Sequence, residues 1–250
     1  MADKKVRIEV NSEIGKLNSV LLHPPGAEVE NMTPQNVQRA LYSDILNLSI
    51  ARQEYAQLYG VLSKVADVYL VNDLLVKVLD NPDARAGLLQ RICVSEDATE
   101  YYDMLLEMPS KKLAKVLIEG LPAKVNTLTS FLRNEYYALY PLYNFYFTRD
   151  ANKVRMRESY IMDAIYRSSG VFDCNVIDAN DFQPEGSPIK MEGGDILVAR
   201  EDILLLGNGC RSSSQGIDFM IERFRRDNDK GRFNIIVQQL PSSPESFIHL

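Results

Sequence analysis

Residues 190–198 of the chain read KMEGGDILV. Two carboxylates, Glu192 and Asp195, bracket a pair of glycines, and an apolar run follows them. Glycines have no Cβ atom, so the backbone can come close to a ligand or to another strand. Apolar runs at residues 195–198 and 203–206 flank a tight polar turn at residues 200–202. This pattern predicts a β-hairpin that begins at Asp195.

The segments around the hairpin predict a repeated unit. Serines at 212–214 are N-cap candidates for a helix with an apolar face, and residues 234–240 predict a further strand. The same order occurs near the start of the chain. It comprises strands at residues 6–10, 17–22 and 67–71 and a helix marked by apolar spacing at residues 50–62, which we expect to bury one face. We therefore expect an α/β protein with a pseudo-repeat of ββαβ modules.

Residues 73–137 have a different character. Their apolar residues recur at helical spacing, and prolines and a glycine punctuate them, which predicts a helical insert. Residues 136–147 are densely aromatic and predict a buried strand. A helix at residues 154–167 and a strand at residues 172–177 follow in the prediction.

The composition limits the class of protein. The chain has 250 residues, of which 46% are hydrophobic, so it can bury the core of one large domain or of a domain with an insert. A net charge of −6 argues against a nucleic-acid surface and agrees with a small cationic substrate. Three cysteines without a CxxC pair argue against a disulfide framework or a structural zinc site. No signal peptide and no apolar run of roughly 18 residues is present, so we expect a cytoplasmic protein without a membrane partner.

The aromatic segment ends in a second candidate acid. Residues 144–150 read NFYFTRD, with Asp150 at the end. Fixed carboxylates suit a guanidinium, which offers five N–H donors in a rigid planar fork. We therefore expect Asp150 and Glu192 to converge on one cleft and hold a guanidinium. The ordinary alternatives are a solvated turn for EGGD and a local ion pair between Asp150 and Arg149.

The sequence has two histidines. His23 stands beside two prolines and is interpreted as a turn residue. His249 can act as a general acid and base if the fold brings it beside the acids, and a structural role is its alternative. Cys210 is the cysteine best placed for nucleophilic chemistry, but no histidine is near it in sequence, so we assign it no role.

Two arginines are candidates for binding an anionic end of a substrate. Arg155 and Arg211 can each take a carboxylate in a bidentate manner. Arg211 also precedes the start of a predicted helix, where anions are favoured. The alternative for both residues is a solvated surface arginine.

Taken together, these segments resemble the arginine deiminase family of the guanidine-modifying (amidinotransferase) superfamily. The resemblance rests on FTRD at residues 147–150 and EGGD at residues 192–195, in this order. Shorter matching stretches are spread over the chain, and they are SEIGKL at 12–17, LLHPPG at 21–26, MTP at 32–34, GCR at 209–211 and IHL at 248–250.

The resemblance implies a fold and an activity. The fold is a pseudo-fivefold α/β propeller of ββαβ modules, with a first module in residues 1–72, the helical insert in 73–137 and further modules in 138–250. The activity is hydrolysis of a C–N bond of a linear amidine, converting L-arginine to L-citrulline and ammonia without a metal or an organic cofactor. A thiolate attacks the guanidinium carbon, ammonia leaves, and water hydrolyses the amidino-thioether.

The resemblance also implies residue roles. Asp150 and Glu192 would grip the guanidinium, and His249 would shuttle protons. The α-carboxylate end and the remaining substrate contacts would fall to a larger set, which is Asn144, Phe147, Arg155, Asp195 and Arg211.

Some features depart from the family pattern. The family has an aspartate two residues after its histidine and a nucleophilic cysteine much later, and Leu250 is the last residue here. Only residues 151–154 separate Asp150 from Arg155, where the family has a longer segment with a strand. We therefore expect the first part of a deiminase that lacks a hairpin, binds guanidines weakly and is inactive by itself. An amidinotransferase, or a non-catalytic guanidine-binding or regulatory module, remains an alternative, and a homo-oligomer is left open.

Overall fold

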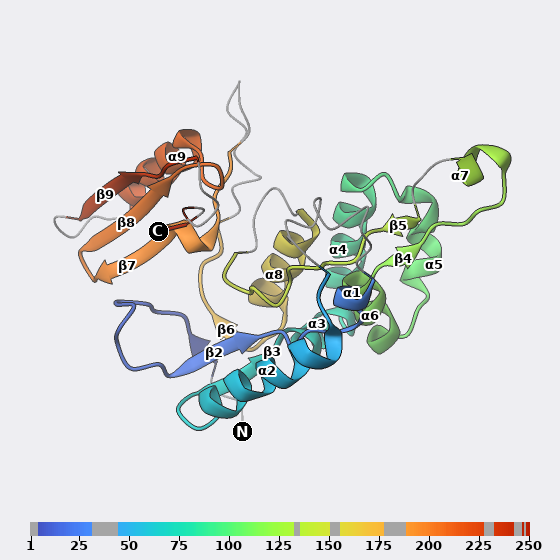
Figure 1. Ribbon diagram of the computed structural model, residues 1–250, viewed down its shortest axis with the longest axis horizontal. Coiled ribbons are helices and arrows are strands. Elements are labelled where there is room, and N and C mark those ends of the chain that lie inside the picture. The colour runs from blue at the N-terminus through green and yellow to red at the C-terminus, as the bar shows by residue number, and fades with distance from the viewer. Residues whose placement is uncertain are drawn as a thin grey trace. The chain divides into compact units, whose positions relative to one another are not determined.

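The structure of the chain is a computed structural model (Figure 1). It describes residues 5–31, 45–132, 136–150, 156–177, 189–227, 233–242, 247 and 249–250. The chain divides into two compact units. The first unit comprises Met1–Lys16, Arg149–Ser159 and Gly170–Leu250, and the second comprises Leu17–Thr148 and Tyr160–Ser169. Helices and strands occur in both units, which confirms the predicted α/β class.

The sheet of the first unit contains the predicted hairpin. β7 (Ile196–Arg200) pairs antiparallel with β8 (Ile203–Asn208), and β9 (Asn234–Gln239) pairs parallel with β8. The helix α9 (Ser214–Asp227) packs on β8 and covers one face of this sheet (Figure 1). The predicted ββαβ order in this part of the chain is therefore confirmed.

Apolar side chains hold this module together. Leu204 and Leu206 of β8 and Ile217 of α9 are buried against one another. The hydroxyl of Ser213 accepts a hydrogen bond from the backbone N–H of Gly216 at 3.2 Å, so one of the predicted serines caps the helix. Leu204 and Leu206 lie two positions apart and point to the same face of the sheet, which explains why both are buried.

A second, smaller sheet in the first unit joins distant segments. β1 (Val6–Arg7) pairs parallel with β6 (Phe172–Asp173). Both predicted strands, at residues 6–10 and 172–177, are present but shorter than predicted. Among the sheets that the structure describes, none closes into a barrel.

The second unit begins with a parallel strand pair. β2 (Ser19–Leu22) pairs with β3 (Asp67–Leu70), and α2 (Leu48–Leu62) lies between them in sequence. Parallel strands need a long crossover, which a helix supplies. The predicted strand–helix–strand order is confirmed, but β1 pairs with β6 and not with β2.

The prediction that α2 buries one face is wrong. The spacing predicted the helix correctly, and the side chain of Asn47 caps it by accepting the N–H of Ile50 at 3.2 Å. However, none of its residues is buried by the described part of the chain, and Ile50 is 55% exposed. Apolar periodicity identifies a face that can be covered, but tertiary packing decides whether it is.

The helical stretch predicted after β3 is confirmed. Its helices up to Glu119 share an apolar side that forms the core of the second unit, where Leu75, Leu89, Leu105, Leu113 and Leu117 are fully buried. The elements are α3 (Val71–Leu79), α4 (Pro82–Ser95), η1 (Thr99–Tyr101), α5 (Tyr102–Leu106), α6 (Ser110–Glu119) and α7 (Leu128–Leu132), and α1 (Ala27–Glu30) precedes them in the same unit. No described helix is both long enough and apolar enough to span a bilayer.

The aromatic segment is a strand over only three residues. β5 (Tyr137–Leu139) pairs antiparallel with β4 (Leu121–Pro122), and Pro141 follows, which has no N–H for a ladder. Residues 143–146 then form a turn, in which Phe147 donates its N–H to the carbonyl of Asn144 at 3.0 Å. The predicted strand through residue 147 is therefore wrong, although the predicted burial is right for Phe145.

The helix predicted at residues 154–167 is α8 (Met156–Ser168). In the second unit, Asp163 of this helix accepts a hydrogen bond from Arg91 of α4 at 2.7 Å. The guanidinium of Arg91 also lies 4.3 Å from the centre of the Tyr160 ring. These contacts fix α8 against the helical core.

Candidate active site

The loop at residues 192–195 is built on close contacts to its glycines. A Cβ atom on Gly193 would stand 1.9 Å from the carbonyl oxygen of Arg149, and one on Gly194 would stand 2.7 Å from the ring of His249. Real Cβ atoms do not approach other atoms so closely, so a larger residue would displace its neighbour. The prediction that these glycines permit close approach is confirmed.

Arg149 fixes this loop to the start of β7. Its side chain donates to the carbonyl oxygens of Gly193 at 3.0 Å and Ile196 at 2.5 Å. Its two terminal nitrogens donate to the two carboxylate oxygens of Glu13 at 2.8 and 2.9 Å. Glu13 in turn accepts the N–H of Val198 at 2.9 Å. The guanidinium of Arg149 is thus fully engaged in structure, and its main ion-pair partner is Glu13 and not the adjacent Asp150.

The Glu13–Arg149 pair changes the acidity of both groups. The hydrogen bonds from Arg149 are the main cause that holds the pKa of Glu13 below its ordinary value, and burial opposes them. The same bonds raise the pKa of Arg149. Both groups are therefore charged around neutral pH, as a bidentate pair requires.

Asp150 meets the same loop. Its Oδ1 accepts the backbone N–H of Gly194 at 2.8 Å, and its residue is half-buried. The ends of the FTRD and EGGD stretches therefore come together at Gly194, although 44 residues separate them in sequence. The local Arg149–Asp150 pair, which was the ordinary alternative, does not explain the position of Asp150.

The two acids of the EGGD stretch are buried. Glu192 is 2% exposed and Asp195 is 1% exposed, and the backbone between them forms the 3-10 turn η4 (Gly193–Asp195). The N–H of Glu192 donates to the hydroxyl of Ser212 at 3.0 Å, which ties the loop to the segment before α9. The alternative of a solvated tight turn is wrong. Buried carboxylates are costly unless charges or donors compensate them.

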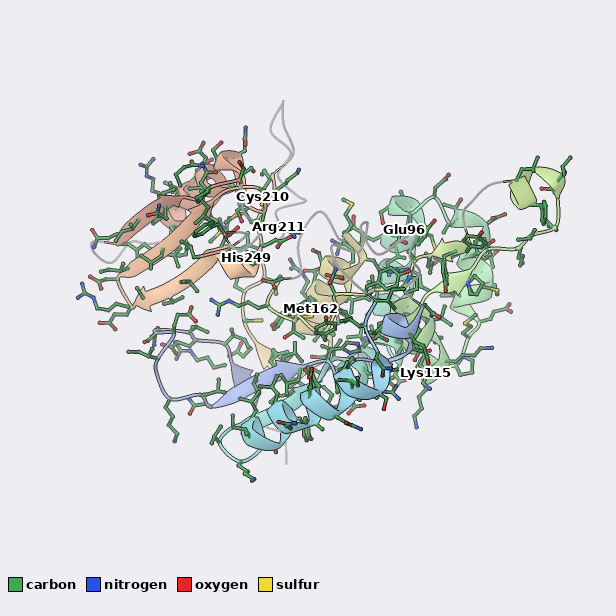
Figure 2. The ribbon with its side chains drawn as sticks, viewed as in Figure 1. Glu96, Lys115, Met162, Cys210, Arg211 and His249 are labelled. Carbon is green, nitrogen blue, oxygen red and sulfur yellow. The ribbon has the colours of Figure 1, made fainter. Side chains whose placement is uncertain are left out.

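His249 lies between these acids. Its Nδ1 is 3.3 Å from Oδ1 of Asp195, and its Nε2 is 3.4 Å from Oε2 of Glu192. Nη1 of Arg211 is 3.6 Å from the other oxygen of Glu192, and Figure 2 labels both Arg211 and His249 in this unit. The condition under which His249 could act as a general acid and base, namely a place beside the acids, is therefore met.

One acceptor in this group is unused. Oδ2 of Asp195 is buried and accepts no hydrogen bond from the described residues. Gly207 gives this side chain room, because a Cβ there would stand 2.7 Å from Oδ1 of Asp195. The arrangement can thus accept N–H donors from a cation, and the imidazole beside it can take up or release a proton. Within the described ranges, no three His, Cys, Asp or Glu side chains are grouped as metal ligands are.

Three other predicted site residues lie outside the described part of the first unit. Asn144 and Phe147 belong to the second unit, where Asn144 is buried and the Phe147 ring packs on that of Tyr146 at 4.4 Å between centroids. Arg155 lies outside the described residues. The roles of all three remain predictions.

The loop depends on Glu13 and Arg149, which were not predicted as site residues. They stand 136 positions apart, so no local pattern links them. The available signal was that they belong to two of the stretches that carried the resemblance, SEIGKL and FTRD. The interpretation of His23 as a turn residue was also incomplete, because its side chain is buried and lies 3.2 Å from Glu28.

Comparisons with known proteins match the chain to one family. The arginine deiminase family model matches residues 38–250. Arginine deiminase 1 of Staphylococcus epidermidis and the arginine deiminase of Staphylococcus haemolyticus are each 28% identical to the chain, and that of Staphylococcus aureus is 27% identical. Each alignment covers 97% of this chain but 65% of the relative, so the chain spans about two thirds of the length of these relatives.

The alignments also run over 270 to 274 positions, which exceeds the 250 residues of the chain. Even within the aligned region, part of each relative therefore has no counterpart here. The match nevertheless extends over both units and includes every residue of the loop at 192–195. The resemblance inferred from the short motifs is confirmed, and the chain belongs to the arginine deiminase family.

Proposed function

We propose that this chain supplies the guanidinium-binding part of an arginine deiminase, which hydrolyses L-arginine to L-citrulline and ammonia. The observation that carries the proposal is a pair of buried carboxylates beside His249. Glu192 lies near one ring nitrogen and Asp195 near the other. Membership of the arginine deiminase family supports it.

The charge balance of the site favours a cationic ligand. Asp150, Glu192 and Asp195 bring three carboxylates to one loop, where Arg211 pairs with Glu192 and Arg149 is already paired with Glu13. A guanidinium compensates buried carboxylates through both its charge and its paired N–H donors. The unused Oδ2 of Asp195 is one acceptor for such a donor. In this proposal Arg211, together with Asn144 and Arg155, binds the α-carboxylate end, and Phe147 packs on the substrate.

The reaction needs a proton carrier and a thiolate. The thiolate forms a bond to the guanidinium carbon, and the C–N bond breaks as ammonia leaves with a proton from His249. Water then attacks the same carbon, the C–S bond breaks, and the product is the ureido group of citrulline. Of the three cysteines in the sequence, none is assigned as this thiolate, and burial raises the pKa of the Cys93 thiol. We therefore expect these 250 residues to bind guanidines without turnover.

The finer architecture belongs to the same proposal. We infer a pseudo-fivefold propeller with its first module in residues 1–72, a helical insert in 73–137 and further modules in 138–250. Two observations support it, namely the β7–β8–α9–β9 module and the parallel β2–β3 pair with α2 between its strands. We also propose a cytoplasmic location and small-molecule L-arginine as the partner, and membership of the family supports both. Self-association remains to be measured.

Binding measured by calorimetry on the 250-residue chain tests the function. L-arginine is expected to bind more tightly than L-citrulline, whose ureido group is neutral. Glu192→Gln removes a charged acceptor and is expected to weaken L-arginine binding by about 10- to 100-fold, since hydrogen bonds to charged groups contribute about 1.5–3 kcal/mol.

The matched control is Asp202→Asn. Asp202 is an acid of the same unit that lies in the β7–β8 turn and pairs with Arg200, so its loss is expected to leave arginine affinity unchanged. Equal binding of arginine and citrulline, or full affinity in Glu192→Gln, would contradict the proposal. Citrulline release from these 250 residues would contradict the expected absence of turnover.

A further inference from the structure

The second unit contains a buried ionisable pair that the proposed reaction does not use. His23 is 5% exposed and Glu28 is 1% exposed, and Nε2 of the histidine lies 3.2 Å from Oε1 of the glutamate. Nδ1 of His23 is buried and has no hydrogen-bond partner among the described residues. A buried carboxylate and an unmatched ring nitrogen both cost free energy, so packing alone is a poor explanation for them.

Glu28 holds the imidazole in one orientation. Its Oε1 also accepts the backbone N–H of Gly26 at 2.6 Å, which fixes the carboxylate at the start of α1. A Cβ on Gly26 would stand 2.5 Å from Oε2, so the glycine is needed for this contact. An imidazole N–H can reach the fixed oxygen only within a narrow range of ring orientations.

The oriented ring supports the aromatic turn at residues 143–146. The His23 ring lies 5.2 Å from the ring of Phe145, centre to centre, at an interplanar angle of 45°. Phe145 is fully buried, and Asn144 directly precedes it in the turn. The hydroxyl of Thr148, just after the turn, donates to the carbonyl of Leu21 at 2.9 Å. His23, just after β2, therefore contacts this turn at its aromatic centre, and Leu21 of β2 contacts the chain just after the turn.

We propose that His23 and Glu28 are positioning residues for the turn that carries Asn144. Glu28 fixes the ring of His23, the ring fixes Phe145, and Phe145 fixes the backbone of Asn144. The pair thereby sets how well the protein distinguishes L-arginine from a guanidine that has no α-carboxylate. This inference rests on the proposed function, in which Asn144 binds the α-carboxylate end.

Tyr55 offers a matched control. Its hydroxyl oxygen accepts the backbone N–H of His23 at 3.1 Å, and burial raises its pKa, so it stays a neutral phenol. Tyr55→Phe removes a hydrogen bond to the same residue. It leaves the contact of Glu28 with the imidazole and the contact of the imidazole with Phe145 intact. A general loss of stability and a loss of positioning are thus separable.

The experiment compares the affinities of L-arginine and agmatine, which share the guanidinium but differ in the α-carboxylate. In Glu28→Ala the preference for L-arginine is expected to fall by about tenfold, the size of one lost hydrogen bond to a charged group, through weaker arginine binding. Glu28→Gln keeps a carbonyl oxygen for both N–H donors and is expected to restore most of the preference. Tyr55→Phe is expected to lower the melting temperature and leave the preference unchanged.

His23→Gln and the NMR signal of the Asn144 side-chain amide complete the test. Glutamine still reaches Glu28 but removes the ring from Phe145, so the preference is expected to fall as in Glu28→Ala, and this variant decides the matter if Glu28→Ala does not fold. The Asn144 amide signal is expected to shift in both variants and to stay in Tyr55→Phe.

The outcomes separate the two proposals. A folded Glu28→Ala or His23→Gln chain with the wild-type preference overturns the positioning role and leaves the guanidinium site intact. An equal loss of preference in Tyr55→Phe also overturns it. A wild-type chain that binds neither L-arginine nor agmatine overturns the proposed function and this inference together.

Discussion

At the scale of single residues, Gly194 has little freedom to change. Its backbone N–H donates to Asp150, and the ring of His249 occupies the space where a Cβ would stand. Any side chain at this position must push His249 away from Glu192 and Asp195. The constraint is steric, and it acts on the residues proposed to bind the substrate.

Gly194→Ala is expected to weaken L-arginine binding by about tenfold and to lower the free energy of unfolding by about 1–3 kcal/mol, as overpacking does. The comparison is Gly87→Ala in α4, where a Cβ meets nothing within 4 Å. That change is expected to raise the free energy of unfolding by about 0.5–1 kcal/mol and to leave binding unchanged. Urea unfolding and calorimetry measure both quantities. If the Gly194→Ala chain binds L-arginine normally, the ring of His249 can move aside without loss of the site.

At the scale of elements, Glu13 links the segment before β2 to β7 and its loop. It pairs with Arg149, accepts the N–H of Val198 and donates its own N–H to the carbonyl of Val198 at 3.0 Å. Arg149 carries this link on to Gly193 and Ile196. One ion pair whose charge depends on pH therefore helps to hold the loop.

The pH dependence follows from the sign of the shift. The pKa of Glu13 in the folded chain lies below its ordinary value of 4.5, so the folded state binds this proton less readily than the unfolded state. The stabilisation is present in full above pH 4.5 and is lost as the pH falls through the lowered pKa. In Glu13→Gln the free energy of unfolding is expected to be lower at neutral pH and to fall less steeply below pH 4.5.

Urea unfolding at a series of pH values checks this expectation. The control is Glu9→Gln, because Glu9 pairs only at the surface, with Arg7 at 3.0 Å. Its acid profile is expected to follow that of the wild type. Parallel profiles for the wild type and Glu13→Gln would remove Glu13 as the source of the acid sensitivity.

The elements that the sequence predicted well are those that local chemistry determines. The β7–β8 hairpin follows from two apolar runs and a polar turn, and α9 from its capping serine. Partners distant in sequence were not predictable in this way. The ion pair of Glu13 with Arg149, the pairing of β1 with β6 and the exposure of Ile50 on α2 all depend on which segments meet. The turn around Asn144 was mistaken for a strand because aromatic residues favour both strands and buried positions.

At the scale of the whole molecule, each unit has its own core. In the first unit the core includes Leu204, Leu206 and Ile217, and in the second it is made by the helices from α3 to α6. Family membership was predictable because the short motifs are spread along the chain. The fivefold propeller remains a proposal, because the described sheets are small and open.

Leu206→Ala tests this division. Leu206 is fully buried in β8, so its truncation is expected to lower the free energy of opening by about 2–5 kcal/mol. The loss of hydrogen-exchange protection is expected in β7, β8 and β9, with the amides of α3 and α6 much less affected. Leu113→Ala in α6 is the reciprocal variant, with the opposite expected pattern. Equal losses in both units would show that the two cores open as one.

The contacts of Glu13 and His249 also have a practical consequence for anyone who labels or trims the protein. The two residues lie 236 positions apart, yet His249 contacts the acids of the loop at 192–195, and Glu13 contacts Arg149 and Val198 beside it. A fluorophore or a proteolytic cut beside either residue would therefore perturb the group of atoms being assayed. An exposed internal position such as Leu128 in α7 is a safer place for a probe.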